Sequence, residues 1–126
     1  MTTVLDASAV LALVFGEAGA ERVADALPDA IVSSVNAAEI VSKLVDRDTP
    51  SEDIDRVWIL VSGLTRDFST TQALRSGQLR ADTRKAGLSL GDRACLALAK
   101  ETGATILTAD RAWADLDLGL NIELIR

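Results

Sequence analysis

Short, continuous apolar runs alternate along the chain with longer stretches in which apolar residues recur every three or four positions. The short runs have the length of buried strands, whereas the longer stretches have the period of amphipathic helices. The pattern predicts strands at residues 2–6, 30–34, 67–70, 104–110 and 121–126, with 67–70 at a sheet edge. It predicts helices in the apolar run after residue 6 and at residues 16–27, 36–47, 51–64, 71–87 and 88–103.

The regular alternation of strands and helices favours a parallel sheet, because parallel strands are joined by helical crossovers. We therefore expect an α/β fold in three layers, with a central parallel sheet of four to five strands and helices on both faces. The chain has no linker, repeat or low-complexity stretch, so residues 1–126 are interpreted as one domain. Functional groups in such sheets gather outside the carboxyl ends of the strands, and chemistry is expected at that edge.

Four acidic residues fall at this edge of the predicted sheet. Asp6 and Asp110 each follow an apolar strand directly. Glu39 and Asp92 lie near the starts of predicted helices that adjoin the other strands. We expect the four carboxylates to form one acidic site. Asp115, about one turn beyond Asp110, could replace or assist it as the fourth acid.

Each of these acids also has a simpler explanation as a helix cap. The segments Asn36-Ala-Ala-Glu39 and Ser89-Leu-Gly-Asp92 have the spacing of capping boxes, and the two acids that follow strands have the position of N-caps. Capping accounts for each acid singly, but it does not require four carboxylates at one edge. The convergence is what favours a functional site.

Carboxylates that converge repel one another, by ~4 kcal/mol for two charges about 4 Å apart at an effective dielectric constant of about 20. A divalent cation bound between them, or protonation of some of them, removes this cost. The chain contains no histidine, so ligation by oxygen alone is expected, which suits Mg²⁺ or Mn²⁺. Such an ion can activate water and offset the charge that develops on a phosphodiester during hydrolysis.

The composition excludes several other classes of function. Without histidine, neither a Ser–His–Asp triad nor a zinc site with histidine ligands can form. A net charge of −6 argues against broad, non-specific binding to nucleic acid. The single cysteine, Cys95, lies in an apolar run and is interpreted as core packing. No apolar stretch approaches the ~20 residues of a membrane span, so we expect no membrane association and a cytoplasmic protein.

Four segments resemble, in order and spacing, the motifs of PIN-domain ribonucleases. They are VLDASAV at 4–10, the Asn36-x-x-Glu39 step, LSLGDRACLALA at 88–99 and ILTADRAW at 106–113. The resemblance covers nearly the whole chain, and it is strongest to the VapC toxins of bacterial and archaeal toxin–antitoxin pairs. It implies a PIN-like fold, a Mg²⁺- or Mn²⁺-dependent pocket and endoribonuclease activity.

The resemblance also assigns residues and partners. Its acids, in order, are Asp6, Glu39, Asp92 and Asp110. Ser8 and Thr108 match polar positions that flank the family's pocket and support it. VapC-like proteins typically form homodimers and are silenced by an antitoxin, so the resemblance implies a homodimer and a VapB-type antitoxin as partner.

A basic stretch precedes and flanks the third acid. It comprises Arg75, Arg80, Arg84, Lys85 and Arg93. Arg80 and Arg84 share one helix face at i,i+4 spacing. Arg80, Arg84, Lys85 and Arg93 are the candidate contacts for RNA phosphates, and a solvated helix face remains the alternative.

The predicted helix 51–64 carries more apolar residues than one buried face accommodates. The surplus indicates a surface for a second copy of the chain or for a partner.

Two other functions remain as alternatives, a catalytically inactive PIN scaffold and a receiver-like phospho-acceptor domain. A receiver needs an acceptor aspartate at the end of a central strand near mid-chain. Here Asp53 and Asp55 lie in a predicted helix, and Asp67 precedes a weak strand. The late strand is followed by Arg111, where a receiver would have lysine.

Overall fold

A sheet of five parallel strands forms the centre of the computed structural model, which describes residues 1–126. The strands are β1 (Thr3–Leu5), β2 (Ala30–Ser33), β3 (Thr65–Arg66), β4 (Thr105–Thr108) and β5 (Ile122–Leu124). Their order across the sheet is β3-β2-β1-β4-β5. Val4 of β1 pairs with Ile31 on one side and Ile106 on the other. The predicted α/β fold with a central parallel sheet is confirmed.

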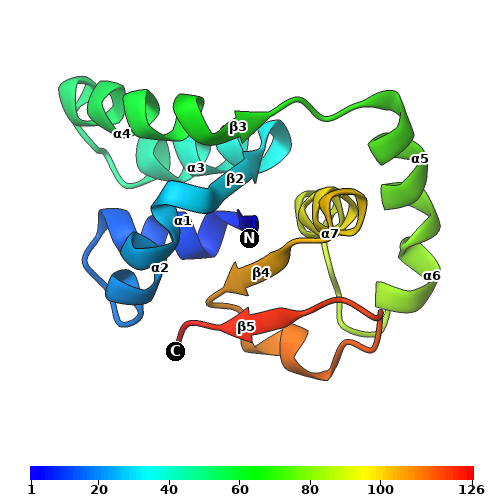
Figure 1. Ribbon diagram of the computed structural model, residues 1–126. Coiled ribbons are helices and arrows are strands. Elements are labelled where there is room, and N and C mark those ends of the chain that lie inside the picture. Colours follow the sequence, from blue (N-terminus) through cyan, green and yellow to red (C-terminus); the bar gives the residue numbers. More distant parts are fainter.

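Helices cover both faces of this sheet, as Figure 1 shows. They are α1 (Ala7–Val14), α2 (Ala20–Ala26), α3 (Ser34–Asp46), α4 (Ser51–Leu64), α5 (Thr70–Gln78), α6 (Arg80–Thr83) and α7 (Leu90–Thr102). Two 3₁₀ helices, η1 (Leu27–Asp29) and η2 (Arg111–Asp115), follow α2 and β4. In Figure 1, α7 lies between the sheet and the outer pair α5 and α6, while α1 to α4 lie on the opposite side. None of the helices is both long and apolar enough to cross a membrane.

Successive residues of the central strands enter two different cores. Val4, Ile31 and Ile106 belong to a buried cluster with α7 and Trp113. Their neighbours in the strands, such as Leu5, belong to a second cluster with α1, α3 and α4. The alternation follows from the pleat of a strand, in which successive side chains point to opposite faces. Because both faces are buried here, the strands appear in the sequence as continuous apolar runs.

Three predicted elements differ from the observed ones. The helix predicted at 16–27 begins only at Ala20, because Gly16 and Gly19 have positive φ angles of 62° and 96° that no helix accommodates. The edge strand predicted at 67–70 lies earlier, at β3. Residues 67–69 form the connection to α5, which begins at Thr70, and Ser69 caps that helix by accepting a hydrogen bond from the Gln72 backbone amide at 3.1 Å.

The helix predicted at 71–87 is divided at Leu79 into α5 and α6. Leu79 is buried in the cluster that contains α7, whereas most of its neighbours are exposed. The division falls at this buried residue, and α5 is the part that packs along α7.

Candidate acidic site

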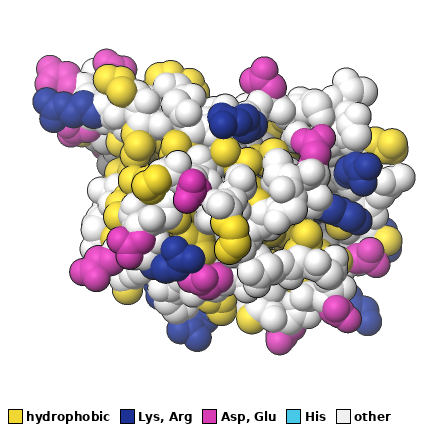
Figure 2. Space-filling model, viewed as in Figure 1, with side chains coloured by type: hydrophobic (Ala, Val, Ile, Leu, Met, Phe, Trp, Pro, Cys, Tyr) yellow, Lys and Arg dark blue, Asp and Glu magenta, His cyan; other side chains and the backbone are white.

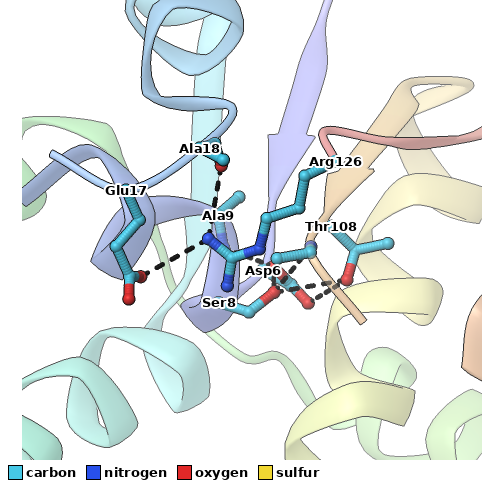
Figure 3. Close-up of polar contacts among 8 residues, drawn as sticks. Asp6, Ser8, Ala9, Glu17, Ala18, Thr108 and Arg126 are labelled. Carbon is cyan, nitrogen blue, oxygen red and sulfur yellow. Dashed lines mark hydrogen bonds and ion pairs between the residues drawn. The ribbon is translucent and has the colours of Figure 1, made fainter. Parts of the chain in front are cut away.

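Asp6 is the most constrained of the predicted acids. It follows β1 and caps α1, and only 4% of it is exposed. Its Oδ1 accepts hydrogen bonds from the Ser8 hydroxyl at 2.7 Å and the Ala9 amide at 2.8 Å. Its Oδ2 accepts one from the Thr108 hydroxyl at 2.6 Å, so strands β1 and β4 are joined through this carboxylate (Figure 3). Asp6 takes part in none of the salt bridges.

Burial raises the pKa of Asp6 from 3.8 to about 6. The hydrogen bonds from Thr108, Ser8 and Ala9 oppose this shift, and the charge of Asp92 adds to it. Asp6 is therefore a carboxylate that is costly to ionise when no cation is beside it.

Ser8 and Thr108 form the support that the sequence predicted around this carboxylate. Their hydroxyl oxygens lie 3.3 Å apart (Figure 3). Each hydroxyl also accepts a hydrogen bond from a backbone amide in the segment after β4. The Ala109 amide donates to Ser8 at 2.9 Å, and the Asp110 amide donates to Thr108 at 3.0 Å. This network fixes the start of the η2 segment against Asp6.

Glu39 reaches the same region from the second turn of α3. The helix begins at Ser34 with Ser33 as its N-cap, so the predicted capping box of Asn36 and Glu39 is wrong. Both residues lie inside the helix, because β2 runs directly into it. Asn36 is 1% exposed, and its amide nitrogen donates to Glu39 Oε1 at 2.7 Å and to the Gly91 carbonyl at 3.0 Å.

Gly91 allows the Glu39 carboxylate to lie against the first turn of α7. A Cβ atom at Gly91 would come within 2.6 Å of Glu39 Cδ and would also overlap both carboxylate oxygens. A larger residue here would force the Glu39 carboxylate to move, and the constraint is one of space alone, since Gly91 has no positive φ angle. From the sequence, Asn36 was named as a possible cap and as part of a family motif, but its contact with Gly91 was not predicted, although a glycine in the first turn of a helix was a usable signal.

Asp92 follows Gly91 in the sequence and lies in the first turn of α7. It forms a complete capping box with Ser89, in which the Ser89 amide donates to Asp92 Oδ2 at 3.0 Å. Here the predicted capping interaction is confirmed. Cys95, one turn further on, is fully buried, and burial raises the pKa of its thiol well above the usual value. The charges of Asp6, Asp92 and Glu39 raise that pKa further.

The fourth predicted acid is less closely integrated. Asp110 is exposed, and its side chain accepts the Ala112 amide at 2.9 Å as the cap of η2. Its backbone amide bonds to Thr108, which in turn holds Asp6. Asp115, the alternative fourth acid, lies at the far end of η2 and lines a separate cavity of about 460 Å³ with Lys85.

The predicted basic residues occupy two different environments. Arg80, Arg84 and Lys85 are exposed on and after α6. Arg93 is half-buried and joins α7 to α5, with its guanidinium donating to the Ser76 carbonyl at 2.9 Å. Arg93 therefore has a structural contact that the sequence did not indicate.

A further cation, Arg126, was not singled out in the sequence. Ile125 donates its amide to the Thr108 carbonyl at 2.9 Å, which brings the next residue to the edge of the sheet near Asp6. The Arg126 guanidinium donates to the Ala18 carbonyl at 3.2 Å and lies 3.5 Å from Glu17 (Figure 3). No sequence pattern marks it, because its place depends on the pairing of β5 with β4.

The acidic side chains are not arranged as a closed set of metal ligands. No group of three or more acids or cysteines has ready-made metal-binding geometry. The reason is visible in the hydrogen bonds, since the carboxylates of Asp92 and Asp110 are turned toward backbone amides of their own helices. The donor set nevertheless fits Mg²⁺ or Mn²⁺, because it consists of carboxylate oxygens. One buried acceptor beside Glu39, the Asn36 Oδ1, also has no hydrogen-bond partner.

The fold is similar to that of chains in several solved toxin–antitoxin structures. A VapBC structure from Salmonella typhimurium, bound to DNA, is 20% identical with a TM-score of 0.78, over 100% of this chain and 99% of that chain. A toxin–antitoxin complex from Klebsiella pneumoniae is 19% identical with a TM-score of 0.77, over 99% and 98% of the two chains. VapBC2 from Rickettsia felis, bound to a promoter fragment, is 18% identical with a TM-score of 0.73, over 98% of both.

At these identities the structural comparison establishes the fold. No curated protein matches the sequence significantly. The family model of the PIN domain matches residues 3–118. That range includes all four predicted acids, Ser8 and Thr108. The chain therefore belongs to the PIN domain family.

Proposed function

We propose that this chain is a metal-dependent endoribonuclease, the toxin of a type II toxin–antitoxin pair. The observation that carries the proposal is that the Glu39 carboxylate lies against Gly91, the residue before Asp92, at the same edge of the sheet as Asp6. Three separate elements supply these acids, and a purely structural role as caps does not require them to share this edge. A buried carboxylate with raised pKa and no salt bridge, such as Asp6, suits a site that receives a cation.

Asp6, Glu39 and Asp92 would hold the Mg²⁺ or Mn²⁺ ion, with Asp110 as the fourth acid. When bound, the ion would lower the pKa of a water molecule and offset negative charge on the phosphodiester. Ser8 and Thr108 keep the Asp6 carboxylate in one orientation. Asp110 is preferred to Asp115, because the Asp110 amide contacts the Thr108 hydroxyl that also bonds to Asp6.

The exposed cations offer contacts for RNA phosphates at the rim of the site. We assign this role to Arg84 and Lys85, which precede α7, and to Arg80 on α6. Figure 2 shows acidic and basic side chains interspersed on one face, without a continuous basic area. Binding should therefore depend on a few contacts, and a net charge of −6 keeps non-specific affinity low.

An antitoxin is the partner that the relatives support, since the Klebsiella pneumoniae structure is a toxin–antitoxin complex. A groove of about 470 Å³ between α3 and α4 suits an apolar helix of such a partner. It is lined by Ser34, Ala38, Val41, Ile54, Asp55 and Trp58. Trp58 is 44% exposed and Ile59 is 75% exposed, so part of α4 lacks cover. Identification of a small DNA-binding protein encoded beside this gene would support the pairing.

We also propose that the chain forms a homodimer. The exposed Ile59 and Leu60 of α4, which do not line the groove between α3 and α4, are the supporting observation. Light scattering of the purified chain at micromolar concentration should give twice the mass of 13.3 kDa. A monomer under these conditions would contradict the dimer and leave the nuclease proposal intact.

The nuclease activity is tested by incubating the chain with RNA and Mg²⁺ or Mn²⁺, and by adding EDTA. We expect cleavage that requires the ion. Absence of cleavage across varied RNAs would favour the alternative of an inactive PIN scaffold, which keeps the fold and the partner surface. Membership of the PIN domain family removes the receiver-like alternative.

A further inference from the structure

Asn36 makes the one polar contact that joins the helix of the second acid to the helix of the third. Its amide nitrogen donates one hydrogen to Glu39 Oε1 at 2.7 Å and the other to the Gly91 carbonyl at 3.0 Å. Gly91 immediately precedes Asp92 in α7. Asn36 therefore fixes the Glu39 carboxylate relative to the first turn of α7, where Asp92 stands.

The orientation of this amide is determined by its neighbours. Exchanging its oxygen and nitrogen would direct an acceptor at two other acceptors, a carboxylate and a carbonyl, which is repulsive. In the favourable orientation Oδ1 is buried without a hydrogen-bond partner. A buried acceptor of this kind destabilises the fold unless a donor reaches it.

We propose that Asn36 is a positioning residue of the metal site. It orients the Glu39 carboxylate for the ion through one hydrogen bond from its amide nitrogen, and the second, to the Gly91 carbonyl, ties that carboxylate to the first turn of α7. This inference rests on the proposed metal-dependent function, and it adds to the four acids a residue that contacts the ion only indirectly.

The chain contains a matched control in Gln72 of α5. Like Asn36 it is buried, with 4% exposed, and its amide donates to a carboxylate, Glu101, at 2.7 Å. Its Oε1 also has no partner. Gln72 joins α5 to α7 and makes no contact with the acids of the site. Removing either amide should have a similar effect on folding, so a difference in metal binding reports the position of Asn36.

The experiment measures Mn²⁺ affinity by calorimetry for the wild type, Asn36→Ala and Gln72→Ala, with no RNA present. Circular dichroism and thermal melting check the fold of each variant. We expect Asn36→Ala to weaken Mn²⁺ binding by about 10–100-fold, the range for residues that orient metal ligands, and Gln72→Ala to leave it unchanged. If Asn36→Ala does not fold, Asn36→Ser carries the same test.

A second measurement separates positioning from a general loss of packing. In a Glu39→Gln background, Asn36→Ala should weaken Mn²⁺ binding much less than in the wild type. The reason is that the carboxylate that Asn36 orients is no longer present. Equal Mn²⁺ affinity of wild type and Asn36→Ala, or equal losses in both backgrounds, would overturn the inference while leaving cleavage by the wild type untouched. A wild type that binds no Mn²⁺ would overturn the proposed function and this inference together.

Discussion

Asp6 combines a structural role with a chemical one at the end of β1. Its carboxylate caps α1 by accepting the Ala9 amide, and it accepts hydrogen bonds from two hydroxyl groups. These belong to Ser8 in α1 and Thr108 in β4. These contacts hold the carboxylate in place, but burial still raises its pKa to about 6. In the proposed function, a bound cation would offset the cost of ionising this carboxylate, and without the cation that cost lowers the stability of the fold.

The free-energy cost of ionising Asp6 predicts that the stability of the metal-free protein depends on pH. Because the pKa of Asp6 is higher in the folded chain, about 6, than its ordinary 3.8, the stabilising protonated form is lost as pH rises from about 4 through 6. The shift corresponds to about 3 kcal/mol at ~1.36 kcal/mol per unit. Asp6→Asn, which cannot ionise, should gain stability relative to the wild type over this range, as measured by urea unfolding in EDTA.

Mn²⁺ should reduce the difference, because it stabilises the ionised carboxylate of the wild type and not the amide. A difference in unfolding free energy that stays constant between pH 4 and pH 7 would contradict the assignment.

Gly91 supplies a second prediction at the level of a single residue. Gly91→Ala should displace the Glu39 carboxylate, because the added Cβ would overlap its oxygens. We expect RNA cleavage to fall by roughly 100-fold, as for other disturbances of metal ligands. Gly77→Ala is the control, since Gly77 lies in α5 with no atom within 4 Å of the added Cβ. It should retain activity and gain about 0.5–1 kcal/mol of stability. Full activity of Gly91→Ala would show that Glu39 has no fixed place in the site.

The sequence identified the acids better than it identified their surroundings. Asp6 and Asp92 were predicted both as caps and as site residues, and the structure shows their capping contacts directly. The amide of Asn36 could not be predicted, because its partner Gly91 is 55 positions away and meets it only when α3 packs on α7. The start of α3 was misjudged for a local reason, since Ser33 rather than Asn36 caps it.

At the scale of the elements, the role proposed for α6 and the segment after it in RNA binding can be tested by mutation. Arg84→Gln combined with Lys85→Gln should weaken the binding of a short RNA in EDTA. If both residues contact phosphates, the dependence of log K on log salt should decrease by roughly 1.4, at about 0.7 per contact for single strands. Arg56→Gln is a control, because Arg56 is exposed on α4 and pairs with Asp53. An unchanged salt dependence would identify the α6 cations as a solvated face.

Element types were predictable where the apolar pattern was strong, and boundaries failed where tertiary contacts decide. The buried strands β1, β2 and β4 were predicted because both of their faces are apolar. The two-residue strand β3 was misplaced, because it exists only through its pairing with Val32 and Ser33 of β2. The helix predicted at 71–87 divides at Leu79, two residues after Gly77, where Leu79 is buried in the cluster with α7.

At the scale of the whole molecule, the strand order brings the acids together. β1 lies in the centre of the sheet between β2 and β4, so the segments that follow these three strands share one edge. Asp6, α3 with Glu39, and Asp110 follow these strands, and α7 with Asp92 leads into β4. This convergence was predictable from the alternation of strands and helices, whereas the approach of Arg126 required the position of β5.

The most direct test of the central claim is the rate of RNA cleavage by wild type, Asp6→Asn and Asp92→Asn over a range of Mn²⁺ concentrations. The proposed site predicts ion-dependent cleavage by the wild type and a loss on the order of 100-fold or more in each variant. Circular dichroism should show that both variants keep the fold. Asparagine retains a side-chain oxygen that can accept the hydrogen bond from the Ala9 amide at position 6 and from the Ser89 amide at position 92. Full Mn²⁺-dependent activity in either folded variant would contradict the account.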